Sequence, residues 1–490
     1  MRRYSRIACS VLILGVMGCS ETGSIQLVAP DSSTTSSSTP TEDPSTATST
    51  TVSTPTVGSP LGDDSIFDHL GNGGYDVDHY EIDLTITDTT GPIDASIRID
   101  AHASQPLSSF ALDSQGLEYS AITVNNSPAT FTHSDTDLTI NPAQPIEVGE
   151  FSVQLTYHDT PELIKGQDLG LMQGLGWLQR DTYAFVLAEP NAASSWLPSN
   201  DVPSDKATFT FHITTPSTMS AIANGELVDT IEHQLTTTRV WSSKRPMATY
   251  LATVMVGTFE LNRQDTPSGL PMWFAYPADL DPKPSVTHVR LGEMIDFFSQ
   301  HFGPFPFDSF GAIVVNESTG LALETQNRPI FGVDTYDDPS IVAHELSHQW
   351  FGDAVSLRDW SDIWLNEGFA TYAAWLWESN SIGTDLDAEV AKLRNQAKQD
   401  RSSPLNLEPG SPQAKTLFGP AVYYRGGACL VELRNLMGAD SFEKLLKQWV
   451  SDHSYGSASS HDFESLAAQL AGKDLRAFFD KWLRTPGFPD

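Results

Sequence analysis

Residues 340–352 read SIVAHELSHQWFG, and this stretch is the strongest indication of the fold class. Asp338 lies just before it and suits the N-cap of a helix, while Gly352 suits the helix end. On that helix His344 and His348 are four positions apart, so both imidazoles project from one face. Two neutral imidazoles at this spacing can bind one Zn²⁺. The stretch therefore predicts a metal-binding helix.

Glu345 directly follows the first histidine and suggests hydrolytic chemistry. A catalytic zinc lowers the pKa of a water to about 7, so a neighbouring carboxylate can accept its proton near neutral pH. A lone His-Glu-x-x-His pattern also arises by chance, and paired histidines occur as satisfied core residues. Glu345 as general base therefore depends on further features of the chain.

A third metal ligand is the first such feature, because a catalytic zinc has three protein ligands and one open position. Residues 362–378, DIWLNEGFATYAAWLWE, predict a second helix with Glu367 in its first turns. A short connection between two antiparallel helices would bring that carboxylate opposite the histidines. Asp362 and Glu378 lie nearer the helix ends and are the alternative ligands.

The His-Glu-x-x-His motif followed by Asn-Glu-Gly-Phe-Ala resembles the gluzincin aminopeptidases, the family of aminopeptidase N and leukotriene hydrolase. The resemblance runs from residue 65 to the end of the chain. It implies one catalytic Zn²⁺ per chain, held by His344, His348 and Glu367. It also implies a multidomain α+β fold, in which an antiparallel β domain precedes a thermolysin-like, mostly helical catalytic domain.

The resemblance also implies a site for the substrate's α-amine. The family's Gly-x-Met-Glu-Asn motif corresponds to residues 321–325, LALET, where Glu324 keeps the Glu and the other motif residues are displaced or replaced. Ala322 in this stretch is expected to contact substrate. Glu189 is the counterpart of a family Glu that approaches the same amine from the β domain. Two carboxylates on one ammonium would require a peptide with a free N-terminus.

The family places a tyrosine in a Tyr-x-Lys-Gly context to stabilise the oxyanion of peptide hydrolysis. Residues 422–427 read VYYRGG, which assigns this role to Tyr423 and puts Arg425 at the Lys position. An oxyanion donor of this kind contributes roughly 10² to 10³ in rate. Tyr424 is the neighbouring alternative.

Hydrophobic periodicity divides the chain between strands and helices. Apolar residues alternate with polar ones over residues 80–86 and 209–213, which predicts half-buried strands. Helical spacing dominates over residues 385–485. We therefore expect a β domain at 65–255 and the zinc catalytic domain at 256–490.

The N-terminus predicts export. Residues 1–18 combine early arginines with an apolar run too short to span a bilayer, as in a signal peptide. The run ends at Cys19 in a context that resembles a bacterial lipobox, so we expect a lipid anchor at the cell surface; the alternative is an ordinary signal and a released protein. Residues 19–64 are dominated by Ser, Thr and Pro and predict a disordered tether.

Composition excludes some partners. The formal net charge of -34 argues against nucleic acid. Of the three cysteines, Cys9 lies in the predicted signal peptide and Cys19 at its processing site, so Cys429 alone provides no disulfide framework. The family's longer members carry a large C-terminal helical domain that this chain is expected to lack, which would leave the site more open. The sequence does not indicate an oligomeric state.

Three other functions remain open at this point. A thermolysin-like endopeptidase would share the zinc ligands without needing the two amine-binding carboxylates. An epoxide hydrolase of the leukotriene type is chemically possible with the same metal. A non-catalytic surface binding module with a structural zinc would need a fourth protein ligand.

Overall fold

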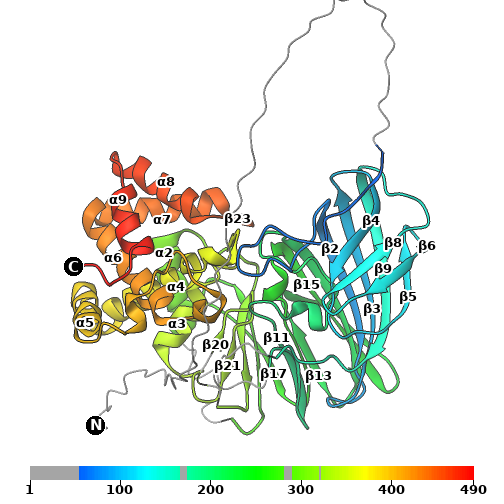
Figure 1. Ribbon diagram of the computed structural model, residues 1–490. Coiled ribbons are helices and arrows are strands. Elements are labelled where there is room, and N and C mark those ends of the chain that lie inside the picture. The colour runs from blue at the N-terminus through cyan, green and yellow to red at the C-terminus, as the bar shows by residue number, and fades with distance from the viewer. Residues whose placement is uncertain (1–53, 166–173, 281–289, 319, 321) are drawn as a thin grey trace, which may run out of the picture. The chain divides into compact units, whose positions relative to one another are not determined.

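The computed structural model describes residues 54–165, 174–280, 290–318, 320 and 322–490. Ser53–Asp490 form one compact unit, with strands in the N-terminal half and most helices in the C-terminal half (Figure 1). The predicted signal peptide, Cys19 and most of the predicted tether lie outside the described residues. The structure draws no boundary at residue 255, so the two predicted domain limits stay predictions.

An eight-stranded sheet is the largest element of the N-terminal half. Its strands, in spatial order, are β14 (Glu226–Glu232), β15 (Thr236–Met247), β12 (Ala207–Pro216), β2 (Tyr75–Thr85), β3 (Ile93–Ala103), β9 (Gly149–Asp159), β5 (Tyr119–Val124) and β6 (Ser127–Pro128). The expected alternation is present, because Tyr80, Ile82 and Leu84 are buried on β2, and Phe209 and Phe211 on β12.

The β2–β12 pair corrects the expectation of a purely antiparallel domain. These two strands run parallel at the centre of the sheet, whereas the other neighbouring strands run antiparallel. The chain leaves the sheet after β9, passes through other strands and returns as β12 in the direction of β2. Sequence alternation gives the face of each residue but not the direction of a neighbouring strand.

Two four-stranded sheets accompany the large sheet. One contains β1 (Thr56–Val57), β4 (Leu107–Asp113), β8 (Asp137–Asn141) and β7 (Thr130–His133), and the other β10 (Gly176–Gln179), β11 (Tyr183–Leu187), β16 (Val254–Gly257) and β13 (Ser220–Ala223).

Strand β1 shows that the predicted tether 19–64 extends too far. Its two residues pair with β4, and the Gly58 N–H donates to the Ser109 carbonyl at 2.9 Å. Asp64 is only 7% exposed. The segment is ordered by backbone hydrogen bonds rather than by large apolar side chains, which is why its Ser/Thr/Pro-rich composition concealed it.

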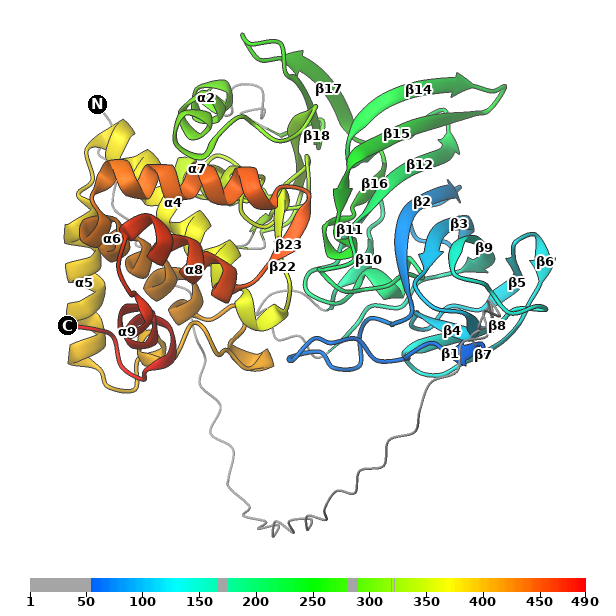
Figure 2. The same ribbon diagram turned by 90° about the horizontal axis from the view of Figure 1, so that it is seen from above.

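The C-terminal half combines a five-stranded sheet with helices (Figure 2). The sheet has the order β17 (Glu260–Asp265), β18 (Pro271–Tyr276), β19 (Phe310–Val315), β21 (Ile330–Gly332) and β20 (Ala322–Leu323). The α-helices among the described residues are α2 (Leu291–Phe302), α3 (Pro339–Ser347), α4 (Trp364–Ile382), α5 (Leu386–Gln399), α6 (Gly426–Met437), α7 (Ala439–His453), α8 (Ser460–Ala471) and α9 (Arg476–Phe479). A short pair, β22 (Val355–Leu357) and β23 (Gly456–Ala458), joins the segment after α3 to the segment after α7. The mixed α+β fold class is confirmed.

Helix α3 ends earlier than the sequence predicts. The helix closes at Ser347, with His348 as its C-cap, instead of continuing to Gly352. The Gly352 N–H donates instead to the Val355 carbonyl at 2.9 Å, which turns the chain toward β22. Among the described helices, none combines the length and apolarity needed to cross a membrane.

Candidate active site

Helix α3 presents the two predicted histidines. Its N-cap is Asp338, whose carboxylate accepts from the Ser340 N–H at 2.8 Å, as expected. His344 lies in the last turn and His348 at the C-cap, and their ring centroids are 4.8 Å apart. The helix therefore brings both imidazoles to one place.

Helix α4 supplies the third predicted ligand from its first turn. Glu367 is 3% exposed, and its Oε2 lies 3.1 Å from Nε2 of His344 and 3.5 Å from Nε2 of His348. The two alternative ligands lie elsewhere: Asp362 accepts from the Ser460 hydroxyl, and Glu378 is in no described cluster that could hold a metal.

The three donor atoms fit a zinc ion. Two ligands about 2.0–2.1 Å from a tetrahedral zinc are about 3.3–3.4 Å apart, and the two measured separations of 3.1 and 3.5 Å bracket this value. Four carboxylates, Glu189, Glu324, Glu345 and Glu367, surround the histidines. Among the described residues no lysine or arginine pairs with these carboxylates, so the site has a surplus of negative charge that a divalent cation would balance.

The surroundings of His348 orient its ring. Nδ1 lies 3.1 Å from the Phe351 carbonyl, to which it donates, and this leaves Nε2 facing Glu367. Gly352 permits this arrangement, because its φ is +129° and an added Cβ would lie 3.3 Å from Nδ1 of His348. Burial lowers the pKa of His348, but Glu324, Glu367 and Glu345 outweigh it and raise the pKa well above its usual value. The site therefore stabilises positive charge on this ring or beside it.

The pKa values of Glu367 and Glu345 are shifted in opposite directions. Burial raises the pKa of Glu367, but the charge of His348 and hydrogen bonds from both histidines lower it to about 2. Burial raises the pKa of Glu345 well above its usual value, and nearby Glu324 and Glu367 add to this effect. A carboxyl group with a raised pKa is suited to exchange protons near neutral pH.

Glu189 and Glu324 converge from different halves of the chain. Glu189 follows β11 and Glu324 follows β20, and their carboxylates lie with that of Glu367 in a cluster whose oxygens are within 4.8 Å of one another. Both are buried, at 5% and 2% exposure. Each has an Oε1 atom without a hydrogen-bond partner among the described residues. Burial, followed by the charge of Glu324, raises the pKa of Glu189 well above its usual value.

Ala322 lies on β20, the edge strand of the five-stranded sheet. It pairs with Phe331 of β21 on one side, and the described strands include none on the other. Ala322 is half-buried, next to the stretch that carries Glu324. The expected contact with substrate stays a prediction that this position permits.

Tyr423 reaches the site from a π-helical turn, η7 (Ala421–Arg425). Its ring stacks on that of His344, with centroids 5.9 Å apart and an interplanar angle of 15°. Burial raises the pKa of Tyr423 well above its usual value, and the surrounding glutamates raise it further, so its phenol stays protonated. Of the two candidate tyrosines, this is the ring that the structure places against a predicted metal ligand.

Arg425, at the family's Lys position, is fully buried and binds backbone carbonyl groups. Its guanidinium donates to the carbonyl oxygens of Leu407, Lys481, Trp482 and Thr485 at 2.6 to 3.1 Å. These contacts fix the backbone of the turn that carries Tyr423 against the C-terminal segment.

Sequence reasoning missed three polar residues near the site, of which Tyr250 and Asp353 are buried and Lys206 is half-buried. Tyr250 accepts a hydrogen bond from Nδ2 of Asn366 at 3.3 Å. Asp353 has no hydrogen-bond partner for either carboxylate oxygen within the described part of the chain. Lys206 donates to the Asp353 and Ala354 carbonyls at 2.7 and 3.1 Å, and its burial lowers its pKa to about 7. Only contacts between residues distant in sequence reveal these roles; Asn366 itself is a sequence-based candidate because it precedes Glu367.

Comparisons with known proteins agree with this geometry. The description "Peptidase M1 N-terminal domain" matches residues 76–251, and "Peptidase family M1 domain" matches residues 291–482. Aminopeptidase M1 of Arabidopsis thaliana is 25% identical over 64% of this chain and 38% of its own length. Aminopeptidase N of Lactococcus lactis subsp. cremoris is 25% identical over 84% of this chain and 51% of its own length. The chain thus spans about half, or less, of these two relatives.

A solved structure matches over a larger share of its own length. The M1 zinc metallopeptidase from Deinococcus radiodurans is 30% identical, with a TM-score of 0.79, over 87% of this chain and 97% of that protein. The agreement extends over both halves of the fold and includes the segments that bring the predicted ligands together. The chain therefore belongs to peptidase family M1, as its sequence resemblance indicated.

Proposed function

We propose that this protein is a zinc aminopeptidase that releases the first residue of peptides with a free N-terminus. One observation carries the proposal: Glu189 and Glu324, both buried and each with an unpartnered oxygen, lie beside a three-ligand metal site. A substrate ammonium would satisfy these oxygens and offset the repulsion between the two carboxylates. An amine held so close to the metal ligands leaves room for about one residue before the cleaved bond.

Each residue of the site has a role in this reaction. His344, His348 and Glu367 would hold the metal, which supplies the charge that polarises the scissile carbonyl and lowers the pKa of a water to about 7. Glu345 accepts the proton of the attacking water and delivers it to the leaving amine. Tyr423 donates its phenol hydrogen to the oxygen on which negative charge develops.

The backbone of the substrate would lie along β20. Ala322 is on the edge strand of the sheet as the described residues form it, and an extended peptide can add to such an edge as a further strand. This placement supports the expected contact of Ala322 with substrate and aligns the peptide toward Glu324, which follows the strand.

The alternatives differ in what they require of the two amine-binding carboxylates. A thermolysin-like endopeptidase has no use for an ammonium site, and Glu189 and Glu324 would then each keep one buried oxygen without a hydrogen-bond partner among the described residues. A structural zinc in a binding module would need a fourth protein ligand and would leave Glu345 without a role.

Hydrolysis of a free tripeptide and of its N-acetylated form tests the proposal. Tyr-Ser-Ala is a suitable probe, because a mutant of the Deinococcus relative was crystallised with it. We expect the purified protein to release the first residue from the free peptide only, and chelation or Glu345→Gln to abolish the release. Equal internal cleavage of longer free and acetylated peptides would favour the endopeptidase. A metal-bound protein that cleaves neither would reject both peptidase functions.

We further propose that the protein is exported and anchored by a lipid at Cys19. The support is in the sequence alone: early arginines, a short apolar run and a lipobox-like context, followed by a Ser/Thr/Pro-rich segment. Wild-type protein expressed in a bacterial host is expected to partition with membranes and to incorporate labelled fatty acid. Cys19→Ala should lose the label, and a labelled Cys19→Ala variant or an unlabelled wild type would reject the anchor.

A further inference from the structure

The segment that follows the export region reaches across the molecule to the active-site helix. We define residues 64–67 as the N-terminal strap. Asp64 accepts hydrogen bonds from the Ile66 and Phe67 N–H groups at 2.9 and 2.8 Å, so the strap forms a tight turn. The second oxygen of Asp64 accepts from the Trp360 N–H at 2.7 Å, 296 positions along the chain.

The contact between the strap and the start of α4 is reciprocal. The backbone N–H and the hydroxyl of Ser65 both donate to Asp359, each at 2.7 Å. Asp359 also caps the short helix η4 (Trp360–Asp362), which leads directly into α4. Two carboxylates, Asp64 and Asp359, thus fix the point at which the chain enters the helix that carries Glu367.

A second connection between the strap and Glu367 runs through buried side chains. The indole of Trp360 packs edge-on against the Phe67 ring, with centroids 6.1 Å apart, and against the Tyr250 ring, with centroids 5.0 Å apart. Tyr250 accepts a hydrogen bond from Asn366, the residue before Glu367. Phe67, Trp360, Tyr250 and Asn366 are each no more than 4% exposed. The path from strap to metal ligand is therefore closely packed and excludes water.

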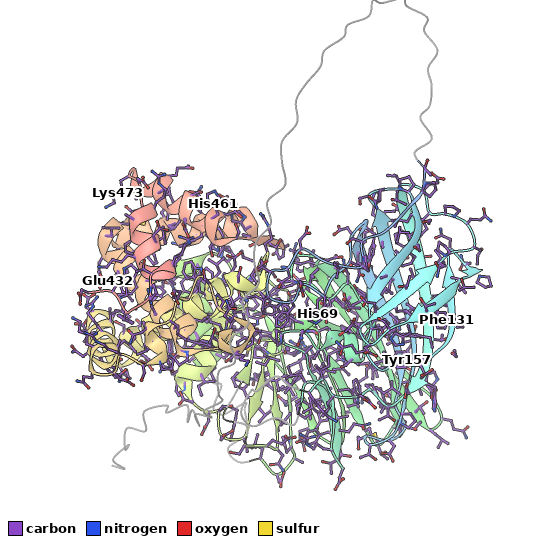
Figure 3. All side chains as sticks on the ribbon, viewed as in Figure 1. His69, Phe131, Tyr157, Glu432, His461 and Lys473 are labelled. Atoms are coloured by element: carbon purple, nitrogen blue, oxygen red, sulfur yellow. The ribbon has the colours of Figure 1, made fainter. Side chains whose placement is uncertain are left out.

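The residues that follow the strap are fixed to the N-terminal half. The Gly71 N–H donates to both oxygens of Asp113 at 3.1 Å, and the Asn72 N–H donates to Oδ1 of Asn200 at 2.6 Å. Figure 3 shows His69, just after the strap, between the strand-rich and helical halves, and Figures 1 and 2 show the same segment reaching toward the helices. The β half thus has a direct connection to the position of Glu367.

We propose that the N-terminal strap is a positioning element of the active site, which sets the place of Glu367 through Trp360, Tyr250 and Asn366. The proposal rests on the proposed zinc site. Residues that orient metal ligands without touching the metal typically contribute 10–100-fold to metal affinity or activity. Packing alone would instead contribute to stability and leave the affinity for zinc unchanged.

Two conservative substitutions interrupt the path at different points. Asp64→Asn keeps one carbonyl oxygen for the strap turn and replaces the other with an NH₂ group, which cannot accept from the Trp360 N–H. Tyr250→Phe keeps the ring against Trp360 and removes the oxygen that accepts from Asn366. Asp63→Asn is the matched control, because Asp63 is exposed and carries the same charge.

Zinc affinity, measured by competition with a chromophoric chelator, is the main readout. We expect Asp64→Asn and Tyr250→Phe each to weaken zinc binding by about 10–100-fold. On a free tripeptide, kcat should fall while KM changes by less than about threefold, since the amine-binding carboxylates are untouched. In the double variant, the loss of zinc-binding free energy should be no larger than the sum of the losses in the two single variants, because both changes act on one path.

The outcomes separate positioning from packing. If Asp64→Asn lowers the Tm of the metal-free protein but leaves its zinc affinity at the level of Asp63→Asn, the strap only stabilises the fold and the proposal is overturned. If Asp64→Asn does not fold, Tyr250→Phe decides in the same way. Weakened zinc binding in a protein that cleaves no peptide would support the strap and reject the aminopeptidase.

Discussion

Replacing Tyr423 by Phe isolates one oxygen atom of the proposed mechanism. The ring stacks on His344 at 5.9 Å, and a phenylalanine ring can occupy the same place. Arg425 fixes the turn through four backbone carbonyls, so the substitution should leave its backbone in position. The change therefore removes a hydrogen-bond donor and little else.

The magnitude follows from what that donor does. Loss of a single oxyanion donor typically lowers kcat by about 10² to 10³, which corresponds to about 2.7–4 kcal/mol of transition-state stabilisation. KM should change little, because a donor to the developing oxyanion acts mainly in the transition state. Zinc affinity should also be unchanged, since Tyr423 is not one of the three residues that would bind the metal.

Steady-state hydrolysis of a free tripeptide, together with a zinc competition assay, checks this prediction. Tyr424→Phe is the matched control, because it removes a neighbouring hydroxyl from the same turn. A fall in kcat of clearly less than about 10²-fold for Tyr423→Phe would refute the assignment, because 10²-fold is the smallest loss expected from removing an oxyanion donor. A larger loss in Tyr424→Phe would transfer the role to that residue.

Three further substitutions test the surroundings of the site. Glu324→Gln should lower kcat/KM for free peptides by roughly 10–100-fold, because a hydrogen bond to a charged group contributes about 1.5–3 kcal/mol. An unchanged kcat/KM would show that Glu324 does not bind the amine. Gly352→Ala should lower the free energy of unfolding, measured by urea denaturation, by about 1–3 kcal/mol, because alanine is strained at a φ of +129°. A variant as stable as the wild type would contradict this strain. Arg425→Ala should destabilise by at least about 3 kcal/mol by leaving buried carbonyls unpaired, with Arg425→Lys intermediate; wild-type stability of Arg425→Lys would show that the charge, and not the set of hydrogen bonds, matters.

The metal ligands were predictable because their geometry is mostly local. His344 and His348 are related by one helical turn, which fixes their relative direction before any tertiary contact forms. Glu367 was harder, since its approach depends on how α3 and α4 pack, and Asp362 and Glu378 remained candidates until the structure placed them. Strand alternation likewise predicted which residues of β2 are buried.

Contacts between residues distant in sequence account for what the sequence could not show. Trp360 meets Phe67 and Tyr250 only in the folded chain, and no local pattern marks any of these three as close to a metal site. Arg425 sits at a position where the family has Lys, yet its hydrogen bonds lead to backbone carbonyls whose direction no sequence pattern encodes. The early end of α3 at Ser347 depends on the turn toward β22 in the same way.

The cluster of carboxylates around the metal ligands makes the stability of the metal-free protein depend on pH. Glu189, Glu324 and Glu345 have folded-state pKa values above their usual ones, mainly because of burial, so the folded protein retains protons that the unfolded chain has released. His348 acts in the same direction, since the carboxylates raise its pKa against the effect of burial. The stability that these four groups contribute is present at low pH and is lost as pH rises. Glu367 does not contribute to this change, because its folded-state pKa is lowered to about 2 and it is ionised in both the folded and the unfolded protein above pH 5.

We therefore expect the Tm of the chelator-treated protein to fall between pH 5.5 and 8, and the difference between zinc-loaded and metal-free protein to widen over this range. Each proton released on unfolding corresponds to about 1.4 kcal/mol per pH unit. The overall negative charge acts in the same direction, so Glu189→Gln is the control: it removes one of the buried carboxyl groups and should make the fall less steep. A metal-free Tm that is constant or rises with pH, or a slope that Glu189→Gln leaves unchanged, would mean that the buried carboxylates do not hold protons in place of the metal.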